Sequence, residues 1–517
     1  MATSRETRVH AYSPEPHGDG NNGDEVFQLS ELGAIEPKLY VHMIEIFSLP
    51  AGADKAQVLS NLSEGLSRTL AGYPILLGTL HFDNEARRIV AKKGPSSSVA
   101  LHVKEPGPAG EIDVEPFSFL DKHDFPVHLL DASKVLPPSA VGVFPVPAGD
   151  LSAEGPPVAA FQVTFIEGGL ILALAITHQV VDGPGCEALL TVWARHSHAV
   201  TKGTANNGTA IPANSHLLPE RSILKAKEDP VSREEWEELD AKFPTYQVRD
   251  GPPAPPPADF KMPVVKTRVW HVSRSNLQKL KALASAPIPA GSPHAGGGAG
   301  GGDEIGGQAW VSTYDALLAL LWRTIVHAKE PLLRPDPSAP SKAVHAVNAR
   351  GRADPPIPGD HIGVAVTLPQ SPALTVADVL SRGLEDTLPL LARTVRAATR
   401  QVTAGYVSDL GRWARAARDL RWVELDMHWV LGLDCMAFDW HTMRSYEEHD
   451  FGFGRPAALR WPHPQFEGFF FTLPTRSTKG NEDEGLEIML GLEESSYARF
   501  EKDEELLRFV EQRGTEV

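Results

Sequence analysis

Cysteine is scarce in this chain. Only Cys186 and Cys435 occur among its 517 residues. Two thiols can form neither a disulfide framework nor a four-cysteine zinc site, so we expect a protein of the reducing cytoplasm. Long apolar runs are absent too, because none approaches the ~20 residues that cross a bilayer. The first twenty residues, MATSRETRVHAYSPEPHGDG, lack the apolar centre of a secretory signal.

Positive charge is also in deficit. Lys and Arg number 49 against 66 Asp and Glu, which leaves a net charge of −17. A nucleic-acid partner requires a clustered basic surface, so none is expected. The motifs HExxH, GxxxxGK[ST] and a strand-linked GxGxxG are missing as well. The sequence therefore predicts no metal site, and nucleotide and dinucleotide chemistry lack support.

The chain is too long for one core and divides by composition. Residues 1–24 are polar and predict a loose tail. Strands and helices alternate over 25–205, which we interpret as an N-terminal domain. A Pro- and Gly-rich connection over 206–262 predicts an interdomain linker. The C-terminal domain spans 263–517 and contains a glycine-rich insert near 291–307, which predicts a floppy loop.

Four further segments have clear helix or strand patterns. Apolar spacing predicts an amphipathic helix over Asp54–Leu70, with Asp54 as its N-cap. A buried helix is predicted over Ser312–Lys329, capped by Ser312. Near the end, Gly485–Leu492 predicts a strand and Ser495–Glu511 an acidic helix.

The most informative stretch is ILALAITHQVVDGPG, residues 171–185. It completes a predicted hairpin in which Phe161–Glu167 and Leu170–Thr177 are joined by a Gly-Gly turn. A helix is predicted to follow over Cys186–Val200. His178 would therefore lie at the end of a rigid strand.

His178 is the candidate catalytic base. An imidazole titrates near neutral pH, so it can accept a proton from a hydroxyl or amine that attacks a carbonyl. Asp182 follows four residues later, and Gly183 is next. On spacing alone, HxxxD is expected about once by chance in a chain with this many histidines. A histidine bonded to its own loop at the core edge is the alternative interpretation.

A second candidate motif, HDFGFGRP, lies far downstream. Asp450, Phe451, Gly452, Phe453 and Gly454 alternate glycine with aromatic residues. This pattern is typical of a tight loop with two rings anchored in a core, and Asp450 is expected to hold the loop.

Together these motifs resemble the BAHD acyl-CoA-dependent acyltransferases. HQVVDG and DFGFG, in this order, match the family's HxxxDG and DFGWG signatures. Matching segments span nearly the whole chain: LSEGLSRTLAGYPILLGTL, STYDALLALLWR, VNARGRADPPIPGDHIG and the C-terminal GLEIMLGLEESSYARF. The sequence departs from the family at Gly363-Val364 and at Asp439, and its insertions resemble those of fungal members.

The resemblance implies an α/β fold like that of chloramphenicol acetyltransferase. Two similar domains, each a mixed sheet flanked by helices, would enclose a channel with His178 at its middle. Acyl-CoA would be a co-substrate, with no permanently bound cofactor. The acceptor would be a small-molecule alcohol of specialised metabolism, acylated without a covalent intermediate. A monomer is expected.

The resemblance also implies structural roles for the other site residues. Asp182 would turn away from the site and pair with Arg350, with Arg352 as the second choice. Gly183 would permit the turn, since it has no Cβ. The five residues 450–454 would shape the domain interface and the mouth of the cofactor site.

Three alternatives remain open. The acceptor could be an amine. The donor could be a carrier-bound thioester, as in condensation domains, although their HHxxxDG centre has Thr177 at its first histidine here. The chain could also be an inactive relative that only binds a metabolite.

Overall fold

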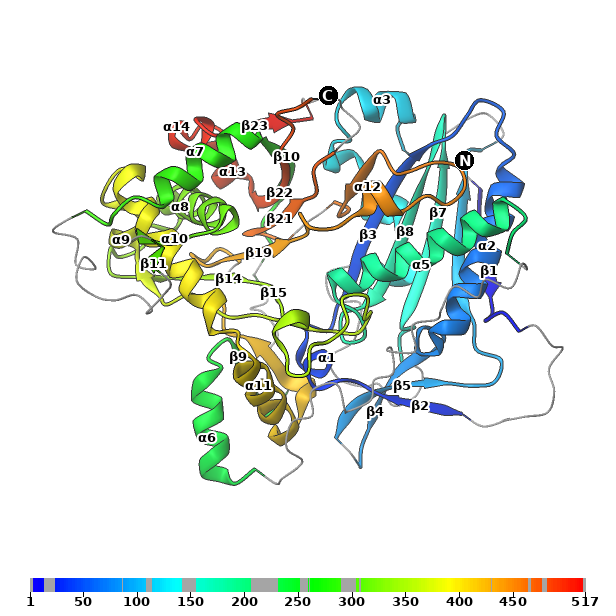
Figure 1. The fold of residues 1–517 in the computed structure, drawn as a ribbon, viewed down its shortest axis with the longest axis horizontal. Coiled ribbons are helices and arrows are strands. Elements are labelled where there is room, and N and C mark those ends of the chain that lie inside the picture. Colours follow the sequence, from blue (N-terminus) through cyan, green and yellow to red (C-terminus); the bar gives the residue numbers. More distant parts are fainter. Residues whose placement is uncertain are drawn as a thin grey trace.

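Two six-stranded sheets organise the protein (Figure 1). The computed structural model describes residues 3–13, 24–85, 87–107, 114–141, 155–205, 231–251, 259, 261–289, 304–305, 308–428, 430–463, 466–476 and 481–514. The first sheet has the order β1 (Thr3–Val9), β6 (Val99–Glu105), β7 (Ala159–Ile166), β8 (Gly169–Thr177), β3 (Tyr40–Ser48) and β20 (Ala458–Arg460). Only β6 and β7 pair in parallel in this sheet.

The central strands of the first sheet, β7, β8 and β3, are buried on both faces, because helices cover both. Along β8, Leu170, Leu172 and Leu174 pack on one side, while Ile171 and Ala173 pack on the other. The first side is covered by α2 (Lys55–Gly72) and α5 (Gly183–Thr201), which lie side by side (Figure 1). The second is covered by α3 (Phe117–Lys122) and α4 (Ala132–Val135). The predicted hairpin and the helices after Asp54 and after His178 are confirmed, with bounds that differ by a few residues.

The second sheet has parallel and antiparallel parts. Its order is β14 (Ala343–His345), β19 (Cys435–Asp439), β21 (Phe469–Leu473), β22 (Leu486–Glu493), β10 (Val265–Val272) and β23 (Val510–Arg513). The first three strands are parallel and the rest antiparallel. Its outer face is covered by α7 (Arg274–Ala284), α8 (Thr313–Leu333), α10 (Leu384–Gln401), α13 (Glu494–Phe500) and α14 (Glu504–Leu507).

Side chains alternate across this sheet and so determine what faces the first body. Cys435, Ala437 and Phe470 pack beneath the helices. Phe438 and Phe471, one residue along, point the opposite way and line a cavity. The inner face of the second sheet therefore forms one wall of the site described below.

The remaining elements are small. A three-stranded sheet is formed by β2 (Glu25–Gln28), β5 (Arg88–Lys93) and β4 (Thr79–Asp83). Two-stranded pairs are formed by β9 (Tyr246–Val248) with β18 (Val423–Leu425), β11 (Glu304–Ile305) with β12 (Gln308–Ala309), β13 (Pro340–Ser341) with β17 (Leu374–Thr375), and β15 (Val347–Asn348) with β16 (Val366–Thr367). The other helices are α1 (Glu31–Ile35), α6 (Arg233–Lys242), α9 (Val376–Leu380), α11 (Ala404–Ala416) and α12 (Ser445–Glu448).

Two expectations about the chain ends are wrong. Within the predicted loose tail, residues 3–9 form β1, because the edge of β6 offers unpaired backbone groups that this segment satisfies. The predicted C-terminal helix breaks into α13, α14 and β23, since Phe500 and Phe509 are both buried but would lie on opposite sides of a single helix. Most of the predicted linker and insert, 206–230, 252–258 and 290–303, lies outside the described residues.

The two bodies exchange segments that the predicted boundaries separate. Late in the chain, β20 returns to the first sheet and pairs with β3. Early in the chain, α1 packs against α11 and its Leu32 and Ile35 join a core of the second body. These crossings place one early segment, α1, and one late segment, β20, where the two bodies meet.

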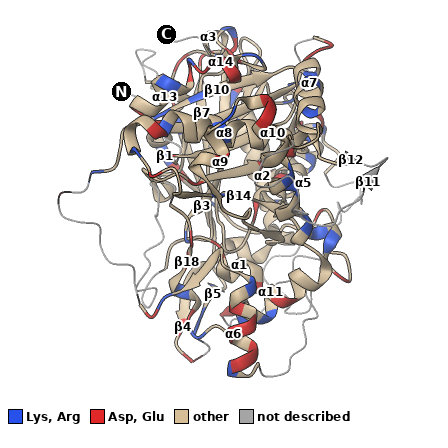
Figure 2. Ribbon diagram, turned by 90° about the vertical axis from the view of Figure 1, so that its left-hand side faces the viewer, with Lys and Arg blue, Asp and Glu red and all other residues tan. Residues whose placement is uncertain are grey.

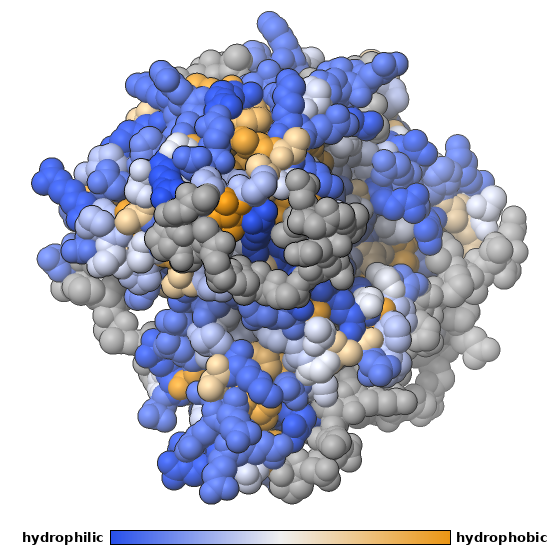
Figure 3. Space-filling view, turned by 60° about the vertical axis from the view of Figure 1, so that its left-hand side comes forward, coloured by the Kyte–Doolittle hydropathy of each residue, from blue (hydrophilic) through white to orange (hydrophobic). Residues whose placement is uncertain are grey.

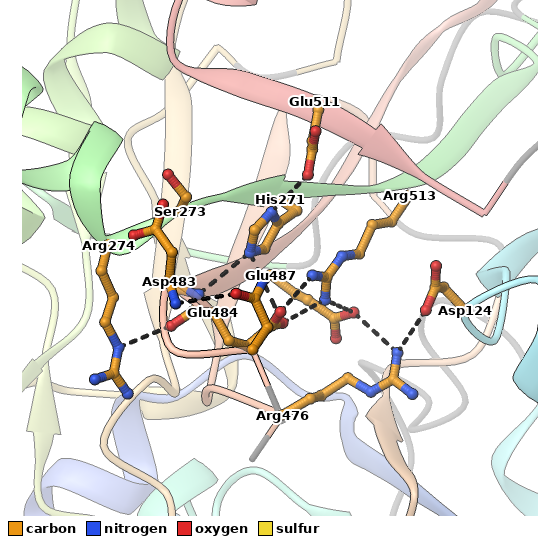
Figure 4. A network of polar contacts seen from close by, with 12 residues as sticks. Asp124, His271, Ser273, Arg274, Arg476, Asp483, Glu484, Glu487, Glu511 and Arg513 are labelled. Carbon is orange, nitrogen blue, oxygen red and sulfur yellow. Dashed lines mark hydrogen bonds and ion pairs between the residues drawn. The ribbon is translucent and has the colours of Figure 1, made fainter. Parts of the chain in front are cut away.

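A buried ionic network joins the bodies near the second sheet (Figure 4). Glu487 of β22 pairs with Arg460 of β20 at 2.7 Å and with Arg513 at 3.1 Å. Arg476 reaches both Glu487 and, at 3.1 Å, Asp124 of the first body. Because each buried charge has opposite-charge partners, the network stabilises one relative placement of the sheets.

The surface is that of a mixed-charge protein. Acidic and basic residues are interspersed over the elements, and α6 exposes both signs (Figure 2). On the face in Figure 3 hydrophilic residues predominate and hydrophobic ones occupy small areas. Within the part of the chain that the structure describes, no helix combines the length and apolarity that a membrane crossing requires.

Candidate active site

His178 lies directly after β8, where pairing with β3 ends. The register places Tyr40 opposite Thr177, and the His178 N–H donates to the Leu39 carbonyl at 2.8 Å. Its side chain is 16% exposed and lines a cavity of about 640 Å³. The strand pairing therefore holds the backbone of His178 rigidly, while part of its ring faces open space.

The cavity lies between the two sheets and is mostly apolar. One wall consists of Leu39 and Val41 of the first body with Ile35 of α1. The other carries six aromatic rings: Phe438, Trp440, Trp461, Phe466, Phe469 and Phe471. Such a lining favours the binding of apolar ligands and keeps water out. Charges that form during a reaction here would therefore be only weakly screened by solvent.

A carboxylate that sequence reasoning missed adjoins His178. Glu36, the residue after α1, is 2% exposed and lines the same cavity, with Oε2 3.5 Å from the Nδ1 of His178. Burial, and then the charge of Asp182, raise the pKa of Glu36 well above its usual value. Burial also lowers the pKa of His178, which keeps the imidazole neutral near pH 7. The segment GAIEPK gives no signal of this contact, which only strand pairing creates.

Asp182 turns away from His178 and is fully occupied. Arg350 binds it with two hydrogen bonds of 2.9 and 2.8 Å, and it accepts two backbone N–H bonds from Gly185 and Ala365. The ion pair implied by the resemblance is present. Arg352, the second choice, instead donates to the backbone carbonyls of Thr399 and Val402 at the C-terminal end of α10. Asp182 caps α5 and also ties the first body to the second.

Gly183 is required for a close approach rather than for the turn. Its φ lies outside the left-handed region. A Cβ there would come within 2.7 Å of the Trp440 Nε1 atom. The expected reason for this glycine is therefore wrong: the absence of a side chain lets the cavity wall pack against the start of α5.

The residues from Asp450 to Gly454 form a loop that packs on the first body. The Asp450 carboxylate accepts N–H bonds from Gly452 and Gly454, both of which have a positive φ. Phe451 and Phe453 each pack edge-on against Phe47 of β3. None of the five residues lines the cavity. They anchor the returning chain, and the rings fill the first core.

The Nδ1 atom of His178 is buried and faces Glu36, so Nε2 is the nitrogen that remains for a reactant. A neutral ring with its proton on Nδ1 could accept a proton at Nε2. The described residues contain no cluster of three or more His, Cys, Asp or Glu side chains arranged to hold a metal ion. The chemistry available to the chain's own groups is general-base catalysis inside an apolar chamber.

Family comparison agrees with this geometry. Residues 127–507 match the Transferase family, and residues 39–196 match the trichothecene 3-O-acetyltransferase-like N-terminal domain. Acetyltransferase FGR3 of Gibberella zeae is 28% identical, over 98% of this chain and 95% of its own. Acyltransferase easC of Emericella nidulans is 26% identical, over 94% and 95%.

Solved structures share the fold. TRI101 of F. graminearum with ethyl coenzyme A matches with a TM-score of 0.69 and 18% identity, over 95% of this chain and 100% of that one. Vinorine synthase matches with a TM-score of 0.62 and 16% identity, over the full length of both chains. The predicted architecture, two mixed sheets each flanked by helices, is confirmed.

Proposed function

The chain belongs to the BAHD family of acyl-CoA-dependent acyltransferases, and from this premise we propose that it acylates a hydroxyl of a small apolar acceptor with His178 as general base. The observation that carries the proposal is the position of His178, at a strand end and in a cavity lined from both sheets. Acyl-CoA is the co-substrate.

The reaction requires one proton acceptor and two aligned substrates. Nε2 of His178 takes the proton of the acceptor hydroxyl as its oxygen attacks the thioester carbonyl. The tetrahedral intermediate then collapses, the C–S bond breaks, and the imidazolium returns its proton to the CoA thiolate. General-base assistance contributes roughly 10²–10⁴-fold. Alignment of the two substrates in the closed chamber supplies much of the rest.

Acetyl is the proposed acyl group, and specialised metabolism the setting. The relatives at 28% and 24% identity include a fungal acetyltransferase and an eremophilane O-acetyltransferase of Penicillium roqueforti. TRI101 has been solved with coenzyme A and deoxynivalenol. The aromatic wall of the cavity here, where Trp461 and Phe471 stack at 5.1 Å, suits a broad, apolar acceptor with few polar groups.

An amine acceptor is the second candidate. Putrescine hydroxycinnamoyltransferase 1 of Oryza sativa is 28% identical over 69% of this chain and 71% of its own, and its name describes an amine substrate. The same His178 could take a proton from a neutral amine as its nitrogen attacks the thioester carbonyl. Parallel assays with alcohols and amines of matched size separate the two candidates.

The test of the base is His178→Ala. We expect kcat to fall roughly 10²–10⁴-fold with an unchanged melting temperature. Turnover is followed as free CoA thiol, with mass detection of the acylated product. His10→Ala, on an exposed residue, is the control and should keep full activity. Wild-type rates in a folded His178→Ala variant would remove the proposed role.

We also propose that the protein is a cytoplasmic monomer. Both cysteines are free and buried, which is compatible with a reducing compartment. Light scattering on the purified protein measures its mass directly.

A further inference from the structure

Glu36 is held beside His178 by three independent features of the fold. The Ser30 side chain caps α1, and Glu36 closes that helix by donating its N–H to the Gly33 carbonyl at 3.2 Å. Helix α1 packs against the loop after His178 so closely that a Cβ on Gly33 would meet the Gln179 carbonyl oxygen at 2.2 Å. The hydrogen bond between His178 and Leu39 then fixes the intervening chain.

Each of the two side chains also has a buried polar atom that needs a partner. Glu36 Oε1 and His178 Nδ1 are both buried and accept or donate no hydrogen bond to another described residue. A buried carboxylate without a partner is costly, so its retention at the wall of a reaction chamber calls for a reason. Oε2 and Nδ1 are 3.5 Å apart, somewhat more than the roughly 2.7–3.2 Å of an ordinary N–H···O hydrogen bond.

Resting on the proposed function, we propose that Glu36 is a positioning residue that accepts the Nδ1 proton of His178, fixes the reactive tautomer and stabilises the imidazolium formed during transfer. When the acceptor hydroxyl gives its proton to Nε2, the Nδ1 proton remains between the ring and Glu36. The Nε2 proton then leaves with the CoA thiolate. Glu36 is unchanged at the end of each turnover.

The charge state of Glu36 sets the pH range in which this works. A protonated Glu36 could donate to Nδ1, which would place the ring's own proton on Nε2 and block the base. Three ionisable groups face the pair: Asp182 raises the pKa of Glu36, Lys38 lowers it, and Tyr246 packs nearby with its own pKa raised. The carboxylate and the imidazole therefore titrate as a pair.

Glu36→Gln tests the role, because it keeps the shape and removes the charge. We expect the plateau kcat to fall on the order of 10-fold, with KM for acyl-CoA within about 2-fold. The acidic limb of the kcat/KM profile should move to lower pH by about one unit. The substitution removes a carboxyl group whose pKa is raised, and it removes an anion that favours the protonated imidazole. Both changes move the acidic limb to lower pH.

Glu31→Gln is the matched control. Glu31 lies on the same short helix, is also buried, and contacts Arg415 at 3.7 Å instead of His178. Its loss should lower the melting temperature but leave the pH profile in place. A wild-type plateau and a wild-type acidic limb in folded Glu36→Gln would overturn the proposal.

A measurement on the wild-type chain keeps the test independent of any variant's folding. In ¹⁵N-histidine-labelled protein, assigned with His178→Ala, we expect the Nδ1–H tautomer of His178 at the pH of maximal activity. An Nε2–H tautomer at that pH would refute the inference. If the wild type releases no CoA thiol with any acceptor, the proposed function fails, while the tautomer still reports on Glu36 alone.

Discussion

At the scale of single residues, the site depends on which neighbour each polar group meets. Asp182 is four residues from His178, yet its oxygens are used by Arg350 and by two backbone N–H groups. The carboxylate that does face the imidazole is Glu36, about 140 residues earlier in the chain. The motifs and the family resemblance pointed to His178 and to the Asp182–Arg350 pair, but the contact between Glu36 and His178 follows from strand register.

Gly183→Ala is a prediction at this scale. The new methyl group would press on Trp440, which lines the cavity, so the wall must shift. We expect a loss of about 1–3 kcal/mol in stability. KM for the acceptor should rise several-fold. Gly405→Ala in α11 is the control: its Cβ would have only a side-chain contact at 3.8 Å and should leave both quantities unchanged. Unaltered KM and melting temperature in Gly183→Ala would contradict the close-packing argument.

At the scale of elements, helix α5 has an unusual N-terminus. Its cap, Asp182, accepts the Gly185 N–H at 2.8 Å and at the same time binds a buried Arg350 from the other body. An ordinary cap is seen on α2, where exposed Asp54 accepts only backbone N–H bonds. The two caps allow the helix contribution to be separated from that of the buried ion pair.

We therefore expect Asp182→Ala and Asp54→Ala to differ in cost. Loss of the α2 cap should cost about 1 kcal/mol. Loss of the α5 cap also leaves the buried Arg350 charge without its carboxylate partner. The free energy of unfolding should fall by roughly 3–5 kcal/mol, with a large fall in soluble yield and activity. Thermal melts compare the two variants. Equal shifts in melting temperature would show that the Arg350 pair adds nothing.

Elements with one strong periodic pattern were predictable. Helices α2 and α8 have consistent apolar spacing and a capping residue, and the β7–β8 hairpin has apolar strands joined by a Gly-Gly turn. All three occur where the sequence indicates. The C-terminal segment was not predictable in this way. Its acidic composition suggests one helix, but the burial of Phe509 and Val510 against the second sheet interrupts it and creates β23.

At the scale of the whole molecule, charge pairs buried between the sheets determine how the bodies meet. Burial alone would raise the pKa of Glu487, but Arg460 and Arg476 lower it to about 2. The folded pKa is thus below the usual value of 4.5. The resulting stabilisation is present above pH 4.5 and is lost as the pH falls towards 2.

Glu487→Gln should therefore be most destabilising near neutral pH, by roughly 3–5 kcal/mol. The difference in melting temperature from wild type should shrink between about pH 4.5 and 2. Glu385→Gln, which removes an exposed pair with Arg508, is the control and should change stability by less than ~1 kcal/mol. A pH-independent difference for Glu487→Gln would refute the ionic explanation.

The sequence by itself determined the local pattern and the reaction class. The hairpin, the capped helices, the place of His178 at a strand end and the two family signatures all depend on residues close together in the chain. Only the tertiary structure decided that β20 completes the first sheet, that Glu36 faces His178, and that alternate residues of β19 and β21 form an aromatic wall. These features arise from contacts between segments that lie tens to hundreds of residues apart, and the spacing of residues in one sequence does not reveal such contacts.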